Sequence, residues 1–575
     1  MALLAQQKNL HWFLALFLIT LATILLFHSV LRGQGPFATG TLGQIMPVEK
    51  TGDTSAFLRD SLVQGYPYHA FAAEKIQKGE FPLWNNLIFA GTPFFGNGQS
   101  AVLSPLKAPF WWLGTYSSFI LSLLLQFIIG GMGMYVLCRA FNWKLTSALI
   151  AALAFILSGQ FLLRSTMNHM SAVMAWLPWL WWSIYQLHHS LKFRWLVLTV
   201  IFTAFTFFSG NFQIAVFCLG ISLIWLLALF QKNHLYKRTW LFVAAIALGL
   251  ALSAVQIIPN LETIKLSYRE TKSLTWSQVL NPKNIFHFEK PNAKVLATAI
   301  DPKIIGVGAN SSGPADFLEI NLFIGPIAII LILFSFLDWK KRLWRINALI
   351  SAAVLIIILF PGLKDILAKI FPWLSVTSVW RIAFILLFSL SLLAGMGAEV
   401  LRRYNKKFIG PIALAIVFVL SLWQWQNVMP SSDKRTLYPN TDFITQIQNQ
   451  TKTTSRLWPK DSGLDQFMPY DIPIILGYDS VYPKTYLELW QANSRVIKPN
   501  QLHATEVSEN LLKVTGASLM LTNKSLPENW QQISAWQDWT LAENKNIQPA
   551  IHAVNKLVTE IHRRTYKTLI PILRL

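Results

Sequence analysis

The sequence predicts a polytopic α-helical membrane protein of about 11 transmembrane helices with an exported C-terminal α/β domain. Three observations predict this class. Of the 575 residues, 53% are apolar and only 13% are charged, whereas a soluble chain carries about 25% charged residues. The apolar residues gather in runs of about 20, the length that crosses a bilayer. The chain from residue 427 onward is too polar for lipid.

The first apolar run follows a short lead that contains Lys8, and it lacks a small-residue cleavage site. It is therefore expected to stay as a signal-anchor helix. The predicted spans cover residues 11–32, 116–138, 145–163, 171–188, 194–209, 211–230, 239–258, 317–337, 345–361, 377–400 and 408–426.

Basic residues cluster in every second loop between these spans, and these loops are short. Such loops face the cytoplasm, which places the N-terminus there too. The loops 33–115 and 259–316 and the tail then share the outer face, because the number of spans is odd. We expect a transmembrane domain over 1–426, including both outer loops, and an exported soluble domain over 427–575. The basic residues are Arg139, Lys144, Lys192, Arg194, Lys232, Lys237, Arg238, Lys340, Lys341, Arg342, Arg345, Arg402, Arg403, Lys406 and Lys407.

Several function classes find no support in the sequence. The net charge of +22 is distributed as loop clusters and not as a polyanion groove, so no nucleic-acid partner is expected. Cys138 and Cys218 lie at or within apolar spans, so no disulfide framework is implied. No nucleotide-binding or zinc-protease motif occurs, and the histidines are scattered. We expect no cofactor and no readable metal site.

The first outer loop carries Asp53 and Asp60 and is unusually long for a loop without a core, a property typical of functional loops. After Asp60, the sequence SLVQGYPYHAFAAEKIQKGE is expected to form a helix along the membrane surface. In the tail, Ala517 to Thr522 alternates like a strand.

Polar residues at membrane depth are functional candidates by default. Here they lie at the outer ends of spans, where they are expected to converge beneath the first loop: Arg164, His169, Asn211, Gln213, Glu319 and Arg381. Structural alternatives stay open at each position. Asp60 could be a surface carboxylate, Asp53 a turn residue and Glu319 a helix cap. The basic residues could anchor helix ends among lipid headgroups.

Several segments resemble known proteins. One long outer loop with an early Asp, many further spans and an exported tail resemble the GT-C superfamily of integral-membrane glycosyltransferases. More narrowly, the chain is similar to the YfhO-like bacterial membrane proteins. The segments that carry this likeness are DSLVQGYP from Asp60, GEFPLWN from Gly79, GTPFFGNGQSAVLSP from Gly91, SGNFQIAVF from Ser209, DFLEINLFIG from Asp316, VWRIAF from Val379, GYDSVYPKTY from Gly477, VTGASLMLTN from Val514 and AENKNIQPAIHAV from Ala542.

The resemblance implies transfer of a sugar from a polyprenyl-phosphate-linked donor to a cell-envelope glycan, lipid or protein acceptor. The reaction would take place at the outer face of a bacterial inner membrane. Asp60 matches the loop Asp of the family pattern and would act as general base, with Asp53 in reserve. Arg381, with Arg164 or Arg269, would pair with the donor phosphate. Gln64, Asn211, Gln213, His169 and Glu319 are further candidate substrate contacts.

Two other functions stay open. A lipid or glycan transporter, or a noncatalytic envelope assembly factor, would use the same polar residues to line a path. An en bloc glycan ligase would share the donor chemistry. Transporters often show internal repeats and polar or broken positions near mid-membrane. Because this sequence shows no convincing repeat and its polar residues gather at one face, it favours the glycosyltransferase.

Overall fold

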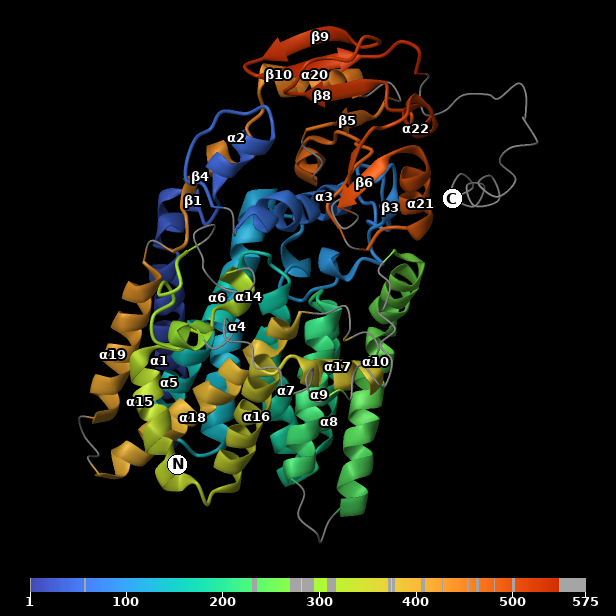
Figure 1. Ribbon diagram of the computed structural model, residues 1–575. Coiled ribbons are helices and arrows are strands. Elements are labelled where there is room, and N and C mark those ends of the chain that lie inside the picture. Colours follow the sequence, from blue (N-terminus) through green and yellow to red (C-terminus); the bar gives the residue numbers. More distant parts are fainter. Residues whose placement is uncertain are drawn as a thin grey trace.

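The computed structural model describes residues 2–55, 58–229, 235–268, 281, 294–307, 317–370, 374, 378–404, 409–426, 428–451, 455–461, 465–479, 481–498 and 502–547. A bundle of long helices forms one end of the molecule, and a sheet-containing part forms the other (Figure 1). The first outer loop lies between them.

The bundle consists of apolar helices that follow the predicted spans. They are α1 (Ala2–Leu26), α4 (Thr115–Ala140), α5 (Leu145–Ile156), α6 (Gly159–Ser165), α7 (Met170–Ser190), α8 (Phe193–Phe208), α9 (Phe212–Leu229), α10 (Leu235–Leu266), α15 (Pro326–Ser335), α16 (Arg342–Leu359), α18 (Ala383–Tyr404) and α19 (Ile409–Trp425). Among the described residues, five helices are long and apolar enough to cross a membrane. A sixth span results if the bent pair α5 and α6 counts as one. The chain is thus multi-pass and mostly helical, while the count of 11 stays a prediction.

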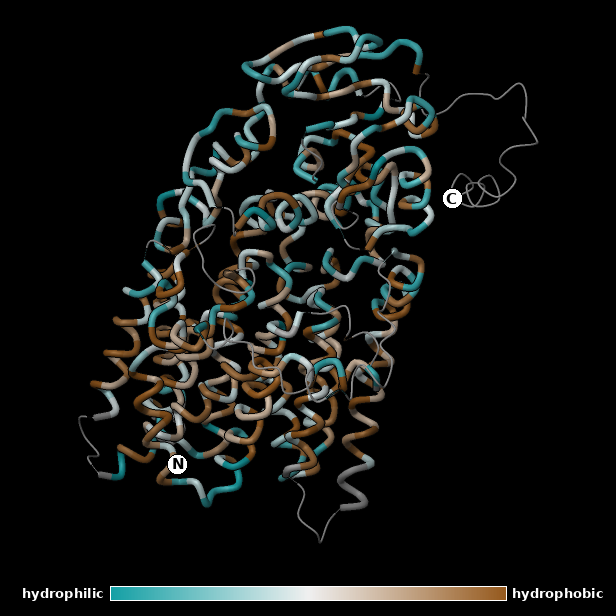
Figure 2. Tube along the Cα trace, in the orientation of Figure 1, coloured by the Kyte–Doolittle hydropathy of each residue, from teal (hydrophilic) through white to brown (hydrophobic). Residues whose placement is uncertain are grey.

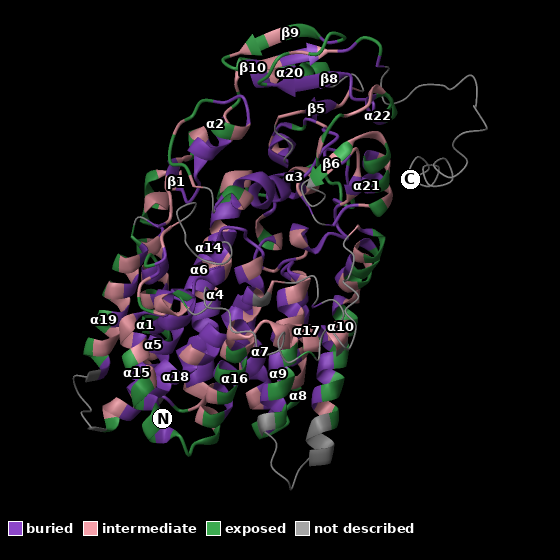
Figure 3. Ribbon diagram, in the orientation of Figure 1, coloured by how far each residue is buried: buried purple, intermediate pink, exposed green. Residues whose placement is uncertain are grey.

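Large apolar side chains cover the outside of this bundle. Leu227 on α9, Leu252 on α10, Leu333 on α15 and Leu349 on α16 are all at least half exposed. Figure 2 shows the hydrophobic colouring concentrated in the bundle, and Figure 3 shows exposed residues on its outer faces. An apolar belt of this extent is unfavourable in water and is typical of a lipid-facing surface.

The third predicted span, 145–163, is not one straight helix. It breaks after Ile156, and α5 and α6 differ in direction by 52°. The break is stabilised because the backbone groups that lose their helical hydrogen bonds there form hydrogen bonds with other segments. The Gly159 N–H donates to the Phe323 carbonyl at 2.9 Å, and the Trp425 indole N–H donates to the Leu157 carbonyl at 2.8 Å.

The eighth predicted span, 317–337, also begins later than expected. A single turn, α14 (Phe317–Ile320), is followed by an extended segment, and α15 starts only at Pro326. Gly325 has a φ of 96°, which a residue with a side chain rarely adopts, and Pro326 lacks the N–H that would continue a helix. Glu319 therefore lies outside the apolar helix that was expected to contain it.

The seventh predicted span ends at 258, but α10 continues to Leu266. This extension packs against the first outer loop. Gln256 Nε2 donates to the Phe95 carbonyl at 2.9 Å, and Asn260 Nδ2 donates to the Gly96 carbonyl at 3.0 Å. Tertiary contacts thus prolong a helix whose apolar run has already ended.

The first outer loop is compact and contains short elements. These are η1 (His28–Arg32), β1 (Gln34–Gly35), η2 (Thr39–Thr41), α2 (Leu42–Ile45), η3 (Ser61–Gly65), α3 (Tyr66–Gln77), β2 (Trp84–Asn85), β3 (Thr92–Pro93), η4 (Gly98–Ser100) and η5 (Ala108–Phe110). The helix expected after Asp60 is present as η3 and α3. Its first turn is a π-helix. Pro67 has no N–H to donate to the carbonyl of Val63, so the regular i to i−4 hydrogen-bond pattern of an α-helix is interrupted there.

The bundle also carries short linking elements. They are η7 (Leu296–Ala299), η9 (Phe336–Asp338), α17 (Gly362–Ile370) and η11 (Val379–Ile382).

The C-terminal part is a mixed α/β arrangement. Its elements are β4 (Ser432–Asp433), η12 (Lys434–Thr436), α20 (Asp442–Thr451), β5 (Leu457–Pro459), η13 (Asp465–Tyr470), α21 (Lys484–Asn493), β6 (Arg495–Lys498), β7 (His503–Thr505), α22 (Glu509–Thr515), β8 (Leu519–Thr522), β9 (Gln531–Trp536) and β10 (Trp539–Glu543). Four strands form one sheet in the order β5-β8-β10-β9. The pair β5 and β8 is parallel and the other pairs are antiparallel. The expected strand over 517–522 is β8.

The C-terminal part is joined to the first outer loop by main-chain contacts. Strand β4 pairs with β1 in antiparallel register, with Gln34 opposite Asp433. The N–H groups of Phe89 and Ala90 donate to the carbonyls of Leu476 and Ile474. The division into domains at residue 426 stays a prediction, as does the export of the second one.

Candidate functional site

Arg381 lies at the centre of a polar network where three elements meet. Its Nε donates to Glu319 Oε1 at 3.2 Å, and its Nη1 donates to Gln213 Oε1 at 2.8 Å. Arg381 belongs to η11 just before α18, Glu319 to α14, and Gln213 to the first turn of α9. Residues that are distant in the sequence thus meet at one end of the bundle.

Arg164 adds a second guanidinium to this region. It is 2% exposed, at the end of α6, and its Nε donates to Gln160 Oε1 at 2.9 Å. Gln160 in turn donates to the carbonyls of Glu319 at 2.7 Å and Asn321 at 3.0 Å. Burial alone raises the pKa of the Glu319 carboxyl, but Arg164 and Arg381 outweigh it, so the net pKa is lowered and the carboxylate stays charged.

His169 immediately precedes α7 and is also buried. Its Nδ1 donates to the Met167 carbonyl at 2.9 Å, while its Nε2 has no hydrogen-bond partner among the described residues. Burial and the neighbouring cations Lys107, Arg381 and Arg164 lower the pKa of His169 to about 3. The neutral ring therefore presents an unused nitrogen beside three basic side chains.

Asp60 comes directly before the π-helical turn η3, and its described partner is Tyr478 in the C-terminal part. Burial raises the pKa of the Tyr478 hydroxyl, and so do the charge of Asp60 and the hydrogen bond to it. The Tyr478 main chain is held as well. Its carbonyl accepts from Gln64 Nε2 at 3.2 Å, and its N–H donates to Asp465 Oδ1 at 2.8 Å.

The turn η3 lies against the turn that carries His169. A Cβ added at Gly65 would lie 3.4 Å from the Met167 carbonyl oxygen, which marks a close backbone approach. The loop bearing Asp60 and the α6–α7 turn bearing Arg164 and His169 are therefore neighbours.

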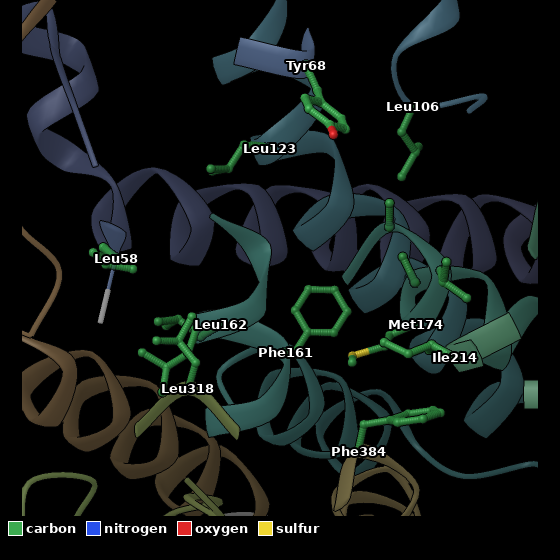
Figure 4. Close-up of a cluster of buried hydrophobic side chains, with 14 of the residues drawn as sticks. Leu58, Tyr68, Leu106, Leu123, Phe161, Leu162, Met174, Ile214, Leu318 and Phe384 are labelled. Atoms are coloured by element: carbon green, nitrogen blue, oxygen red, sulfur yellow. The ribbon is translucent and has the colours of Figure 1, made fainter. Parts of the chain in front are cut away.

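The first outer loop and the helices that carry these polar residues also share one apolar cluster. Figure 4 shows side chains of the first loop, α4, α6, α7, α9, α14 and α18 around one region, among them Leu58, Tyr68, Leu106, Leu123, Phe161, Leu162, Met174, Ile214, Leu318 and Phe384. The elements that carry the polar residues are thus packed together by their apolar faces.

Two other predicted residues make turn or cap contacts in place of contacts with this network. Asp53 is exposed, and its Oδ2 accepts from the Ser431 N–H at 3.2 Å, a contact typical of a turn residue. Asn211 Oδ1 accepts from the Ile214 N–H at 3.0 Å and so caps the start of α9. Arg269 lies outside the described residues.

Sequence reasoning missed Lys107, Gln160 and Tyr478. Lys107 is the lone charge in the apolar run LSPLKAPFWW, which is the signal that could have revealed it. Tyr478 gave no comparable signal, because its partner Asp60 lies more than 400 residues earlier in the chain.

The fold and this polar network define a multi-pass α-helical membrane protein with buried basic residues at one end of its bundle. The sequence model of the family described as bacterial membrane protein YfhO matches residues 102–446, more than half of the chain. The protein belongs to this family of bacterial membrane proteins. No curated protein matches it.

Solved structures with some likeness include an archaeal oligosaccharyltransferase. AglB from Archaeoglobus fulgidus, in complex with an inhibitory peptide and a dolichol-phosphate, is 13% identical with a TM-score of 0.44. That match covers 90% of this chain and 69% of AglB. The crystal structure of the Archaeoglobus fulgidus oligosaccharyltransferase in complex with Zn and sulfate is 14% identical with a TM-score of 0.48, covering 88% and 67%. At these scores the folds are only loosely alike, and nothing about the activity of this chain follows.

Proposed function

We propose that this protein is a glycosyltransferase that moves a sugar from a polyprenyl-phosphate-linked donor to an acceptor of the cell envelope. The observation that carries this proposal is the meeting of Arg381, Arg164 and Glu319 beside the loop segment that begins with Asp60. It combines basic groups for a phosphate with a carboxylate for a hydroxyl group.

The basic residues suit the donor. A polyprenyl-phosphate sugar presents its phosphate at the headgroup level, and its bond to the sugar breaks with negative charge moving onto that phosphate. Guanidinium groups hold such oxygens by charge-assisted hydrogen bonds. Because this charge grows during the reaction, fixed cations stabilise the transition state more than the ground state. Glu319 orients Arg381 by the 3.2 Å contact.

The loop carboxylate suits the acceptor. An acceptor hydroxyl attacks the anomeric carbon from the face opposite the leaving phosphate, and it must lose its proton as the new bond forms. Asp60 takes that role in this proposal as general base. Inversion at the anomeric carbon follows from this single displacement. No nucleotide is required, since the lipid phosphate is itself the leaving group.

The orientation in the membrane belongs to the same proposal. From the basic loops we expect the N-terminus in the cytoplasm of a bacterial cell, and the polar network and the C-terminal part on the outer side of the inner membrane. Donor and acceptor then meet outside the cytoplasm.

Sugar transfer by the purified, reconstituted protein tests the proposal. A general base contributes about 10²- to 10⁴-fold, so Asp60→Asn should lower the transfer rate by at least a hundredfold while the protein still inserts. Glu49→Gln, which removes an exposed carboxylate of the same loop, is the matched control and should transfer normally. Asp53→Asn shows whether the other loop aspartate takes part.

Two results would contradict the proposal. Transfer at the normal rate by Asp60→Asn would exclude Asp60 as the base. Movement of labelled lipid across vesicles by the wild-type protein, without any covalent product, would favour a transporter instead.

A further inference from the structure

A pocket of about 470 Å³ lies between the ends of α4, α7, α16 and α18. It is at the opposite end of the bundle from Arg381. The apolar span Trp380–Arg403 contains Arg381 at its start and Arg403, which lines the pocket, at its end. At 1.5 Å per helical residue these two positions are about 33 Å apart, close to the thickness of the hydrocarbon core of a bilayer. The pocket therefore lies at the level of the lipid headgroups of the other leaflet.

The surroundings of the pocket are typical of a membrane interface. Figure 1 shows the connection between α15 and α16, which borders the pocket, at the end of the bundle away from the sheet. Aromatic side chains form part of the lining. The ring of Phe141 is 5.7 Å from that of Trp143 and 5.0 Å from that of Tyr185, measured between centroids. Tryptophan and tyrosine prefer this depth because one end of each ring is polar.

The charged side chains of the pocket give it a positive formal charge. Three basic residues, Lys341, Arg342 and Arg403, face two carboxylates, Asp338 and Glu399. Asp338 is 7% exposed and holds two of the cations. Its oxygens accept from Arg403 Nη1 and Nη2 at 2.8 Å each, and Lys341 Nζ is 2.7 Å from its Oδ2.

The carboxylates position these cations without using all their donors. The side chains of Lys341 and Arg403 are 53% and 46% exposed, although both contact Asp338. An ammonium group has three N–H donors and a guanidinium group has five. Both can therefore bind a further acceptor while they hold Asp338. Glu399 is engaged at the other side, where it accepts from Arg402 Nη2 at 2.8 Å and from the Lys144 N–H at 3.0 Å.

Exposed apolar side chains lie directly beside the charged ones. Phe336 and Leu337 immediately precede Asp338 in η9 and are 54% and 59% exposed. A ligand in this pocket thus meets basic groups at one point and an apolar surface next to it. This combination matches an anionic headgroup joined to acyl chains.

We propose that this pocket binds the headgroup of an anionic phospholipid, with Lys341, Arg342 and Arg403 holding its phosphodiester and the acyl chains lying along Phe336 and Leu337. Basic pockets between transmembrane helices bind such headgroups at the cytoplasmic side, which is the side that the basic loops predict for this end of the bundle. The site is separate from the polar network around Arg381, and its existence does not depend on sugar transfer.

The headgroup chemistry is shared by a lipid and by a soluble phosphate ester, and the experiment separates the two. Equilibrium binding and ligand-induced thermal stabilisation are measured on the delipidated full-length protein in a nonionic detergent. The probes are phosphatidylglycerol, phosphatidylcholine with the same acyl chains, and glycerol phosphate.

A pair of double variants separates the pocket from general surface charge. Lys341→Gln with Arg342→Gln removes two basic residues that line the pocket. The matched control is Lys340→Gln with Arg345→Gln, which removes the same charge from exposed positions of the same segment. In the control pair, Lys340 Nζ lies over the Trp339 ring and Arg345 donates to the Lys340 carbonyl.

The proposal expects phosphatidylglycerol to stabilise the wild-type protein more than phosphatidylcholine does. The pocket double variant should bind phosphatidylglycerol about tenfold or more weakly, because each basic residue near an anionic lipid contributes to the attraction. The control double variant should bind like the wild type. If the pocket double variant does not fold, Arg342→Gln alone, with Arg345→Gln as its control, should show a smaller loss in the same direction.

Three results would overturn the proposal: equal losses in the pocket and control variants, wild-type affinity in the pocket variants, or equal stabilisation by the two lipids. Equal losses would show that positive charge at this end of the bundle attracts lipid without a specific site. Stabilisation by glycerol phosphate as strong as that by phosphatidylglycerol, and lost in the pocket variant, would support the anion site and assign it to a soluble phosphate ester.

Discussion

Tyr478, from the C-terminal part, donates its hydroxyl hydrogen bond to the carboxylate of Asp60 in the first outer loop. Gln64 and Asp465 hold the main chain of Tyr478 on both sides. The orientation of the Asp60 carboxylate thus depends on a segment that lies after all the apolar helices. Because the C-terminal part supplies the contact of Tyr478 with Asp60, it contributes a residue to the proposed site.

This contact predicts the effect of Tyr478→Phe. Loss of a hydrogen bond to a charged group costs about 1.5–3 kcal/mol, so sugar transfer should fall about tenfold or more while donor binding stays the same. Initial rates at saturating donor and the donor binding constant check this. Tyr470→Phe is the matched control, because its hydroxyl donates to the Pro439 carbonyl instead. Equal losses in both variants would show that Tyr478 acts only through stability.

Gly159 predicts a stability effect at the break between α5 and α6. A Cβ at this position would lie 2.2 Å from Asn321 Oδ1 and 2.8 Å from the Asn321 carbonyl oxygen. Gly159→Ala must therefore displace the segment that carries Glu319, at a cost of about 1–3 kcal/mol. Thermal unfolding of the purified protein measures it.

Gly220→Ala is the control for that measurement. Gly220 lies on α9, and a Cβ there would meet nothing within 4 Å. The melting temperature of this variant should stay the same or rise slightly, since alanine favours a helix over glycine. Equal stability of the two variants would contradict the role assigned to Gly159.

Glu319 predicts how stability depends on pH. Its pKa in the folded protein lies below the ordinary value of 4.5, because Arg164 and Arg381 outweigh the effect of burial. The stabilisation from its charged form is therefore fully present above pH 4.5 and is lost as the pH falls through the lowered pKa. The wild type should melt at a higher temperature than Glu319→Gln at neutral pH. This difference should shrink as the pH is lowered below 4.5. A difference that is independent of pH would show that the carboxylate charge does not stabilise the fold.

Much of the helical bundle could be predicted from the sequence, because apolar runs of the right length form helices in lipid whatever their neighbours. The breaks at Gly159 and before Pro326 could not, since both depend on contacts between segments far apart in the chain. The polar positions were visible for a similar reason: Arg381 and Glu319 stand out against apolar surroundings. The electrostatic influence of Lys107 on His169, and the contact of Tyr478 with Asp60, exist only after the first loop has folded against the bundle and the C-terminal part.

The proposed orientation can be tested with single cysteines, because both native cysteines, Cys138 and Cys218, are buried. Ser525 lies at an exposed position just after β8, and Lys340 is exposed between α15 and α16. The basic loops predict opposite sides of the membrane for these two positions. In cells whose outer layers admit small reagents, a membrane-impermeant maleimide should label Ser525→Cys without further treatment. Lys340→Cys should be labelled only after the inner membrane is permeabilised. Labelling in the reverse order would place Arg381, Arg164 and Asp60 on the cytoplasmic side, where a reaction with acceptors outside the cell is impossible.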